Sequence, residues 1–443
     1  MKTESDFLQQ WFVRLNSENI CYAVLRNYQW LPYGCDGSDV DIWVKKKDYK
    51  KFVRITDACA KENEGALVSY TPDSICPRII YQALGWGVQL DVHIDVAIHR
   101  GVPYMTDTLI ESHIVKYNGV KILSKEIDSL ICFLKEVLNN KKCKEEYCIQ
   151  VSELFSHISD SEVDEYLSNF SEKVRRQLRE VIRNRYFSKE ALCELGILCS
   201  HDLQSFSSRI KYSLNQSFKL GRLFKQPGYT IAFLGTDGAG KSTVINTITP
   251  ILNDAFHHGV RYEHMRPNHF PSLAVLMGKN KADGPSTACS NPHASKPSGW
   301  VGSLFRVSYY MLDYTWGYFR KVFLDKAFKT HVWLFDRYFY DYLIDPRRAR
   351  VSLPQWILQL YSFFVPVPDI ILCLGGDPQK IFVRKSETSL EEVIRQTDAL
   401  RDFCNHNSKA VWVDTTIAPQ ESIDCAMEAI KTMMARRFSN IKL

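Results

Sequence analysis

The stretch Y-T-I-A-F-L-G-T-D-G-A-G-K-S-T, residues 229–243, decides the fold of the second half of this 443-residue chain. Its apolar start is typical of a buried strand, and the remainder matches the pattern G-x-x-x-x-G-K-[S/T] through Gly235, Gly240, Lys241 and Ser242. Glycine is needed there because the backbone N–H groups must turn inward around phosphate oxygens. The stretch therefore predicts a strand, a phosphate-binding loop and a helix, in that order.

The polar residues of this loop have predicted roles toward a nucleotide. Lys241 is expected to reach the β- and γ-phosphates of ATP, and the Ser242 hydroxyl is expected to bind Mg²⁺. The helix that follows would present its positive N-terminal end to the same phosphates. We predict that ATP·Mg²⁺ is bound by Gly235, Asp237, Gly238, Ala239, Gly240, Lys241, Ser242 and Thr243.

Length and composition indicate the broad class of protein. With 45% hydrophobic and 24% charged residues, a chain of this length is typical of a globular protein of two or three domains. Its net charge of +6 is mild, so it suits small anionic substrates and does not indicate nucleic acid as a partner. The oligomeric state stays open, and a dimer is one of the possibilities.

Cysteine usage and the N-terminus favour a cytoplasmic location. The 13 cysteines form no C-x-x-C pair, and Glu4 and Asp6 stand where a secretion signal would carry basic residues. The most apolar stretches, such as residues 361–374, are interrupted by prolines and Asp369 and are too short to span a bilayer. We expect reduced thiols and no transmembrane segment.

Acidic residues form a second pattern near the N-terminus. In G-S-D-V-D-I-W-V, residues 37–44, Asp39 and Asp41 share one face of a predicted strand because side chains alternate along it. A later predicted strand, residues 89–95, carries Asp91, His93 and Asp95 on one face. Carboxylates that share a face repel one another unless a divalent cation lies between them. The alternative is an ordinary strand whose acids face solvent.

An Asp-x-Asp strand followed by another acidic strand resembles the polymerase-β-like nucleotidyltransferase superfamily. The resemblance implies that Asp39, Asp41 and Asp91 hold Mg²⁺ for nucleotidyl transfer, with Asp95 as the alternative third member. The family also has a Gly-Ser turn, upstream of its acidic pair, that holds nucleotide phosphates. Leu25-Arg26-Asn27 stands at that point here, and Gly37-Ser38 only leads into the acidic strand. The fold is therefore better supported than retained nucleotidyl transfer.

The rest of the chain predicts three parts. Residues 1–123 form the α+β nucleotidyltransferase-like domain, and residues 124–226 a helical segment with a basic linker. Gln226-Pro227-Gly228 is the expected boundary before the third part, residues 227–443. There, further strands at residues 259–263, 331–336, 368–374 and 411–414 alternate with helices, so we predict a doubly wound α/β domain with a parallel sheet.

Features after the phosphate-binding loop indicate an acceptor site. Asp336 ends a predicted strand beside the loop, where an acid can bind Mg²⁺ or an acceptor hydroxyl, and Arg347 and Arg348 add cations on the same rim. Residues 267–300 are rich in Pro, Gly and Ser and are predicted to form a loop over the site. The aromatic segment 300–323 predicts a helix that packs on the sheet, or else lines an acceptor pocket.

Taken together, these motifs resemble the thymidylate kinase family of nucleoside monophosphate kinases over residues 228–440. They are G-T-D-G-A-G-K-S-T, Asp336-Arg337-Tyr338, Pro368-Asp369 with Asp377-Pro378, and Arg384-Lys385. The resemblance implies phosphoryl transfer from ATP, with Lys241, Asp336, Arg337 and Arg384 as catalytic residues. It also assigns the acceptor to Arg266, Asp336, Arg337 and Tyr338, and Mg²⁺ to Ser242 and Asp336.

Two departures from that family leave the acceptor open. The insertion between Pro267 and His331 is long, and residues 339–348 extend the Asp336-Arg337-Tyr338 triplet. A nucleoside monophosphate such as dTMP is the first acceptor predicted. The pairing with a nucleotidyltransferase-like domain resembles bacterial two-domain proteins of surface-polysaccharide synthesis, so a sugar or sugar phosphate is the alternative. A nucleotide-gated binding or regulatory module is a third interpretation.

Overall fold

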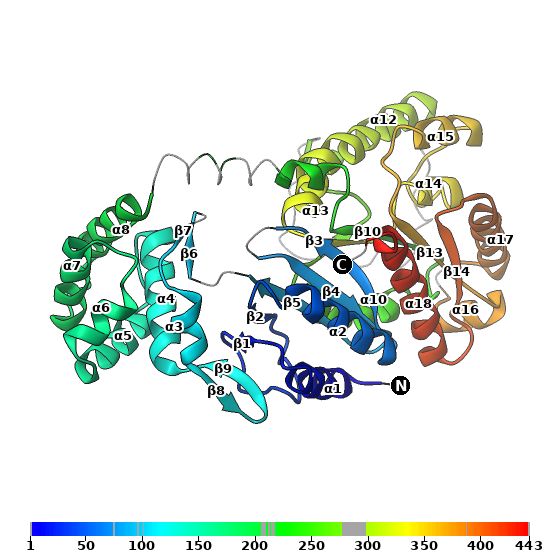
Figure 1. Ribbon diagram of the computed structural model, residues 1–443. Helices are drawn as coiled ribbons and strands as arrows, with labels where there is room; N and C mark the ends of the chain where they lie inside the picture. Colours follow the sequence, from blue (N-terminus) through cyan, green and yellow to red (C-terminus); the bar gives the residue numbers. More distant parts are fainter. Residues whose placement is uncertain are drawn as a thin grey trace.

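The C-terminal half is built on a five-stranded parallel sheet (Figure 1). The structure, a computed structural model, describes residues 2–73, 76–94, 97–100, 102–204, 210, 213, 218–276, 298–386 and 388–441. The sheet order is β11-β12-β10-β13-β14, with bounds β10 Tyr229–Gly235, β11 Val260–His264, β12 Val332–Asp336, β13 Ile370–Gly375 and β14 Ala410–Asp414. β10 is central and buried along its length, which explains the unbroken apolar run before the loop.

Helices cover both faces of this sheet, as the doubly wound pattern predicted. One face packs on α10 (Lys241–Ala255) and α18 (Pro419–Phe438). The other packs on α12 (Trp300–Gly317), the π-helix η2 (Tyr318–Phe323), α14 (Asp341–Ile344), α15 (Gln355–Ser362) and α17 (Leu390–His406). The shorter helices are α11 (Leu273–Leu276), α13 (Leu324–Phe328) and α16 (Pro378–Arg384). Residues 277–297, most of the predicted loop over the site, lie outside the described residues.

The N-terminal part contains a mixed sheet of seven strands in the order β3-β4-β5-β2-β1-β9-β8. Its strands are β1 Tyr22–Val24, β2 Val40–Val44, β3 Ala66–Thr71, β4 Arg78–Gln82, β5 Gly87–His93, β8 Ile114–Tyr117 and β9 Val120–Leu123, with a separate pair β6 Ile98–His99 and β7 Val102–Pro103. The helices of this part are α1 Glu4–Ser17, α2 Tyr49–Glu62 and α3 Asp107–Ser112. The predicted α+β organisation is thus observed, while its assignment to nucleotidyltransferases stays a prediction.

A bundle of helices follows between residues 125 and 203, whereas the division of the chain at residues 124 and 226 stays a prediction. The bundle comprises α4 Lys125–Asn140, α5 Glu145–His157, α6 Asp160–Tyr166, α7 Glu172–Arg183 and α8 Lys189–Leu203, and a 3₁₀ turn, η1 Phe218–Leu223, precedes β10. In Figure 1 the bundle lies on the far side of the N-terminal sheet from the C-terminal half. No helix among the described residues is both long and apolar enough to cross a bilayer.

The N-terminal sheet packs directly on the C-terminal half. Val68 and Ile80 belong to the same hydrophobic core as α10 and α18. The Tyr229 hydroxyl lies within hydrogen-bonding distance of two carbonyl oxygens, that of Val68 and, at 3.2 Å, that of Met434. The two sheets therefore belong to one packed body at this contact, although the sequence divides them into separate parts.

Gly87 lies at a tight contact between the two halves. A Cβ at this position would lie 2.4 Å from Cβ of Ala255 at the end of α10. Gly87→Ala is expected to lower the free energy of unfolding by about 1–3 kcal/mol, because the two backbones must separate. Urea denaturation measures the change, with Gly221→Ala as control because nothing lies within 4 Å of a Cβ there. Equal stability of the two variants would contradict this tight contact.

Candidate functional site

The glycine-rich loop that was predicted to bind phosphate has the backbone that its glycines predicted. Gly238 and Gly240 adopt left-handed φ angles of 84° and 77°, and α10 begins directly afterwards at Lys241. Gly235 is needed for another reason, since a Cβ there would lie 2.5 Å from the Leu374 carbonyl oxygen of neighbouring β13. Two glycines thus shape the loop, and the third lets the strands pack.

Lys241 lies inside the loop. Its side chain is buried, and Nζ donates hydrogen bonds of 2.9 Å to the carbonyl oxygens of Gly235 and Thr236. Burial, with the nearby Arg337 charge as the second cause, lowers the pKa of Lys241 to about 7. An anion placed in the loop would favour the charged ammonium, so this lysine is suited to bind phosphate.

Arg337 connects the loop to the end of β12. The residue has a φ angle of 73°, and its guanidinium donates to Asp341 and, at 2.6 Å, to Oδ1 of Asp237 in the loop. Arg348 donates to the other oxygen of Asp237. Burial alone would raise the pKa of Asp237, but the Arg337, Lys241 and Arg348 charges outweigh burial and hold it at about 2. The buried Arg337 is thus fixed between the carboxyl groups of Asp237 and Asp341.

Asp336 ends β12 next to this network and has an oxygen free for a ligand. Oδ2 accepts a hydrogen bond of 3.1 Å from the Tyr262 hydroxyl, whereas Oδ1 is buried and has no hydrogen-bond partner among the described residues. Burial would raise its pKa, but His264, Lys241 and Arg337 lower it below the usual value. Carboxylate and hydroxyl oxygens are ligands that Mg²⁺ prefers, so Asp336 and Ser242, on the wall of the same cavity, fit the predicted ion.

Two adjoining cavities open around these residues. The first, of about 540 Å³, is lined by Asp237, Gly238, Gly240, Lys241, Ser242 and Thr243 together with Asp336, Arg384 and Lys385. The second, of about 330 Å³, is lined by Arg266, Arg306, Tyr310, Asp341, Tyr342 and Asp345. His264, Arg337 and Arg348 line both. Both volumes fall in the range of small-molecule sites.

The arginines of the second cavity differ in their partners. Arg266 donates a 2.6 Å hydrogen bond to Asp313, whose side chain is fully buried. Arg306 donates to the Ala349 carbonyl oxygen at 3.1 Å but pairs with no carboxylate among the described residues, and its buried Nε has no hydrogen-bond partner there. Arg306 therefore keeps its charge available for an anion, unlike Arg266, Arg337 and Arg348.

The predicted site residues do not all reach these cavities. Arg384 lines the first and donates a 2.8 Å hydrogen bond to the Thr415 carbonyl oxygen. Tyr338, predicted to bind the acceptor, lies in the core with its hydroxyl donating to the Pro366 carbonyl oxygen at 2.7 Å, and it lines neither cavity. Gly235 and Ala239 line neither cavity. His264 and Arg306 were missed, because no local pattern distinguishes them.

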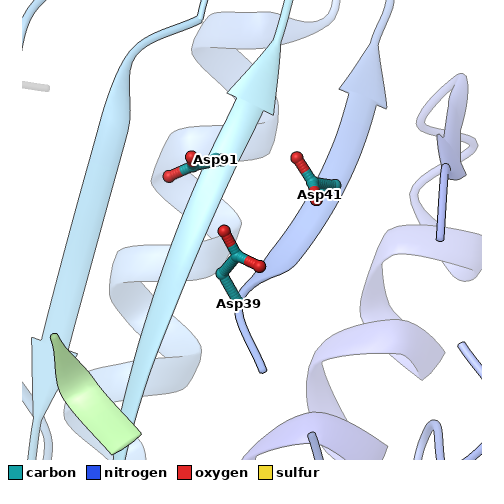
Figure 2. Close-up of side chains that lie close together, drawn as sticks. All are labelled: Asp39, Asp41 and Asp91. Atoms are coloured by element: carbon teal, nitrogen blue, oxygen red, sulfur yellow. The ribbon is translucent and has the colours of Figure 1, made fainter. Parts of the chain in front are cut away.

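Three predicted metal-binding carboxylates of the N-terminal part lie close together in the structure (Figure 2). Oxygens of Asp39, Asp41 and Asp91 lie within 4.8 Å of one another, with Asp41 and Asp91 directly paired across β2 and β5. The predicted proximity is thus confirmed. Asp95, the alternative third member, lies outside the described residues.

Arginine side chains already offset the charge of two of these carboxylates, Asp41 and Asp91. Arg26 and His93 both bond to Asp41, the latter at 3.0 Å, and Arg78 bonds to both oxygens of Asp91 at 2.8 and 2.9 Å. Among the described residues Asp39 forms no ion pair with an arginine. Burial, Asp41 and Asp91 raise the pKa of Asp39, and His257 and Arg26 oppose that shift. The oxygen donors fit a divalent cation next to Asp39, but such an ion must share Asp41 and Asp91 with two arginines.

The segment after β1 and the turn before β2 position residues of this cluster. Arg26 belongs to Leu25-Arg26-Asn27, the segment that directly follows β1. Gly37-Ser38 is a tight turn before β2, in which the Ser38 N–H donates to the Cys35 carbonyl oxygen at 2.9 Å. Its predicted role as a lead into the acidic strand is confirmed.

Comparisons with known proteins add little to this geometry. No family model matches the chain, and no curated protein matches it. Among solved structures, the chain is similar to thymidylate kinase from Ehrlichia chaffeensis, with 15% sequence identity and a TM-score of 0.31. The likeness covers 46% of this chain and 99% of that one.

Proposed function

We propose that the C-terminal half transfers the γ-phosphoryl group of ATP to a small acceptor. The observation that supports this most is the junction of the two cavities. The loop that fits nucleotide phosphates lines the first, and Arg337 and Arg348 line both. ATP bound in the first cavity would therefore direct its terminal phosphate toward an acceptor in the second, with Arg337 beside both.

Each polar residue of the first cavity then has a role. Lys241 and Arg337 offset negative charge on the transferring group, and Arg384 adds a cation from α16. Ser242 and Asp336 would hold Mg²⁺, which supplies charge neutralisation between the β- and γ-phosphates when bound with ATP. Asp336 could instead accept a hydrogen bond from the acceptor hydroxyl. Positioning and charge, with no covalent intermediate on the protein, account for the reaction.

The acceptor is proposed to be a nucleoside monophosphate such as dTMP, with a sugar phosphate as the alternative. Tyr310 and Tyr342 line the second cavity and can stack on a base or a sugar ring. Arg306 favours an acceptor that carries an anionic group. A cytoplasmic location, where ATP is available, is part of this proposal.

A transfer assay with γ-³²P-ATP and Mg²⁺ tests the proposal against nucleoside monophosphates and sugar phosphates. Label on dTMP would support a nucleotide kinase, and label only on a sugar phosphate would support the alternative. Tight ATP binding without transfer to any acceptor would contradict phosphoryl transfer and favour the nucleotide-gated regulatory module.

Arg306 provides a sharper test of the acceptor. Arg306→Gln is expected to raise KM for the phosphorylated acceptor by about 10- to 100-fold, the usual effect of losing a charge-assisted hydrogen bond. KM for ATP should stay unchanged, because Arg306 lines only the second cavity. Steady-state kinetics measure both constants, with the exposed Arg320→Gln as control. An unchanged acceptor KM would exclude Arg306 as an anion ligand.

Nucleotidyl transfer by the N-terminal part is a second candidate, favoured by the convergence of Asp39, Asp41 and Asp91. Calorimetric titration with Mn²⁺ tests it without any substrate. The wild-type chain is expected to bind Mn²⁺ here and Asp39→Asn to lose that binding. If the heat of Mn²⁺ titration is the same for wild type and Asp39→Asn, no ion binds at these carboxylates, and Arg26 and Arg78 offset their charge in place of a metal.

A further inference from the structure

Asp336 ends β12 with a backbone that neighbouring strands hold on both sides. Its register partners are Phe233 on β10 and His264 on β11. Directly after it, the Arg337 N–H donates to the Phe233 carbonyl oxygen at 2.9 Å. The Met265 N–H donates to the Asp336 carbonyl oxygen at 2.8 Å. The sheet thus sets the position of the Asp336 backbone, and only rotation about the side-chain bonds decides where its carboxylate oxygens point.

Two side chains of β11 limit that rotation. Tyr262 and His264 are two positions apart on this strand, so their side chains lie on the same face. The Tyr262 hydroxyl donates a 3.1 Å hydrogen bond to Oδ2 of Asp336, and Nδ1 of His264 lies 3.6 Å from the same oxygen. One carboxylate oxygen of Asp336 is therefore occupied from β11.

The other carboxylate oxygen of Asp336 remains for a ligand. Oδ1 is buried and has no hydrogen-bond partner among the described residues. Asp336 lines the first cavity together with Lys241 and Ser242. Burial of an acceptor without a partner is costly, because its lost hydrogen bonds to water are not replaced. The unpartnered oxygen thus lies at the cavity where the proposed function places Mg²⁺.

The ring of Tyr262 contributes little to the core, whereas its strand is firmly held. Tyr262 is 54% exposed, and β11 is the edge strand of the sheet. Glu263, whose side chain points to the opposite face, accepts a 2.9 Å hydrogen bond from Asn268 and pairs with Lys321. An exposed ring on a fixed strand indicates that the Tyr262 hydroxyl, rather than packing of the ring, is what this position supplies.

We propose that Tyr262 is a positioning residue for the Mg²⁺ site and restricts Asp336 to coordination through a single oxygen. The inference rests on the Mg²⁺ role that the proposed function gives to Asp336, and it adds a reason for ion selectivity. Mg²⁺ needs a near-ideal octahedral arrangement and few carboxylates, whereas the larger Ca²⁺ takes about six to eight oxygens and often both oxygens of one carboxylate. Asp336 with one oxygen held by Tyr262 therefore suits Mg²⁺ better than Ca²⁺.

Binding of Mn²⁺ to the full chain in the presence of ADP tests the role of Tyr262. Mn²⁺ shares octahedral oxygen coordination with Mg²⁺, and electron paramagnetic resonance measures the free ion. The signal compared is the part of the binding that Asp336→Asn abolishes, which excludes ions at other carboxylates. Tyr262→Phe removes one hydroxyl from an exposed ring, so the variant should fold. Its Mn²⁺ binding is expected to weaken by about tenfold, the usual effect of losing a hydrogen bond that orients a metal ligand.

Competition with Ca²⁺ separates positioning from a general distortion of the site. In Tyr262→Phe both oxygens of Asp336 can turn toward one ion, so the preference for Mn²⁺ over Ca²⁺ is expected to fall by about threefold or more. A distorted site would weaken the binding of both ions equally. Tyr309→Phe is the matched control, because its hydroxyl donates to the Pro271 carbonyl oxygen at 2.8 Å and Tyr309 lines neither cavity.

The outcomes distinguish this inference from the proposed function. Wild-type affinity and selectivity in Tyr262→Phe, with binding lost in Asp336→Asn, would overturn the positioning role and leave the proposed function intact. Equal weakening of Mn²⁺ and Ca²⁺ in Tyr262→Phe would overturn coordination through a single oxygen. Full Mn²⁺ binding in Asp336→Asn would contradict the metal role of Asp336 itself, and with it both the proposed Mg²⁺ site and the role of Tyr262.

Discussion

Lys241→Met is expected to reduce phosphoryl transfer from ATP by about 100- to 1,000-fold, the usual effect of removing one preorganised charge donor from a transition state. The Lys241 ammonium group lies inside the loop and is held by two backbone carbonyl oxygens, so its position is set before any ligand binds. Methionine has a similar length and no charge, and the fold should persist. Single-turnover transfer of γ-³²P measures the loss.

The charge of Lys241 gives this prediction a second measurement. With a pKa of about 7 in the free protein, Lys241 is mostly neutral at pH 8, and bound phosphates would raise that pKa. ATP binding at pH 8 should therefore take up a proton, and affinity should fall as pH rises above 7. Calorimetry in buffers of different ionisation enthalpy detects the uptake, with the exposed Lys380→Met as control. Transfer at the wild-type rate by Lys241→Met would contradict its role.

The backbone of the glycine-rich loop at residues 235–241 could be predicted because its residues are contiguous. Two left-handed glycines and the lysine that opens the next helix follow from one short pattern. Strand alternation likewise placed Asp39 and Asp41 together. Arg78 could not be found in this way, because its contact with Asp91 depends on the register between β4 and β5, which a local pattern does not contain.

The position of Tyr338 could not be predicted from the local sequence pattern. It follows Asp336 and Arg337 in the sequence, so it was predicted to bind the acceptor with them. The left-handed φ angle of Arg337 turns the backbone at the end of β12, and the Tyr338 ring packs against Tyr314 and Phe335 instead. Similarly, the aromatic pattern of residues 300–323 predicted packing on the sheet but did not show that a second side of the helix stays exposed.

Arg337→Met is expected to lower the free energy of unfolding by about 3–5 kcal/mol, the usual cost of removing one member of a buried ion pair. Arg337 lies between Asp237 and Asp341. Its loss would leave Asp341 buried without that partner, while Asp237 keeps its ion pair with Arg348 and the nearby Lys241 charge. Denaturant unfolding measures the cost. Asp341→Asn combined with Arg337→Met should recover part of it, because one buried charge is removed.

The pH dependence separates this explanation from a simple packing defect. In wild type, Asp237 has a pKa of about 2, below the value near 3.9 of an unfolded chain, so its stabilising effect is present above pH 4 and lost between pH 4 and 2. In Arg337→Met, Asp237 without its Arg337 partner would take up a proton at higher pH, which relieves the cost of its burial. The difference in unfolding free energy between the two proteins should therefore shrink as pH falls below 4. A difference that is constant with pH would mean that lost packing, and not unpaired charge, destabilises the variant.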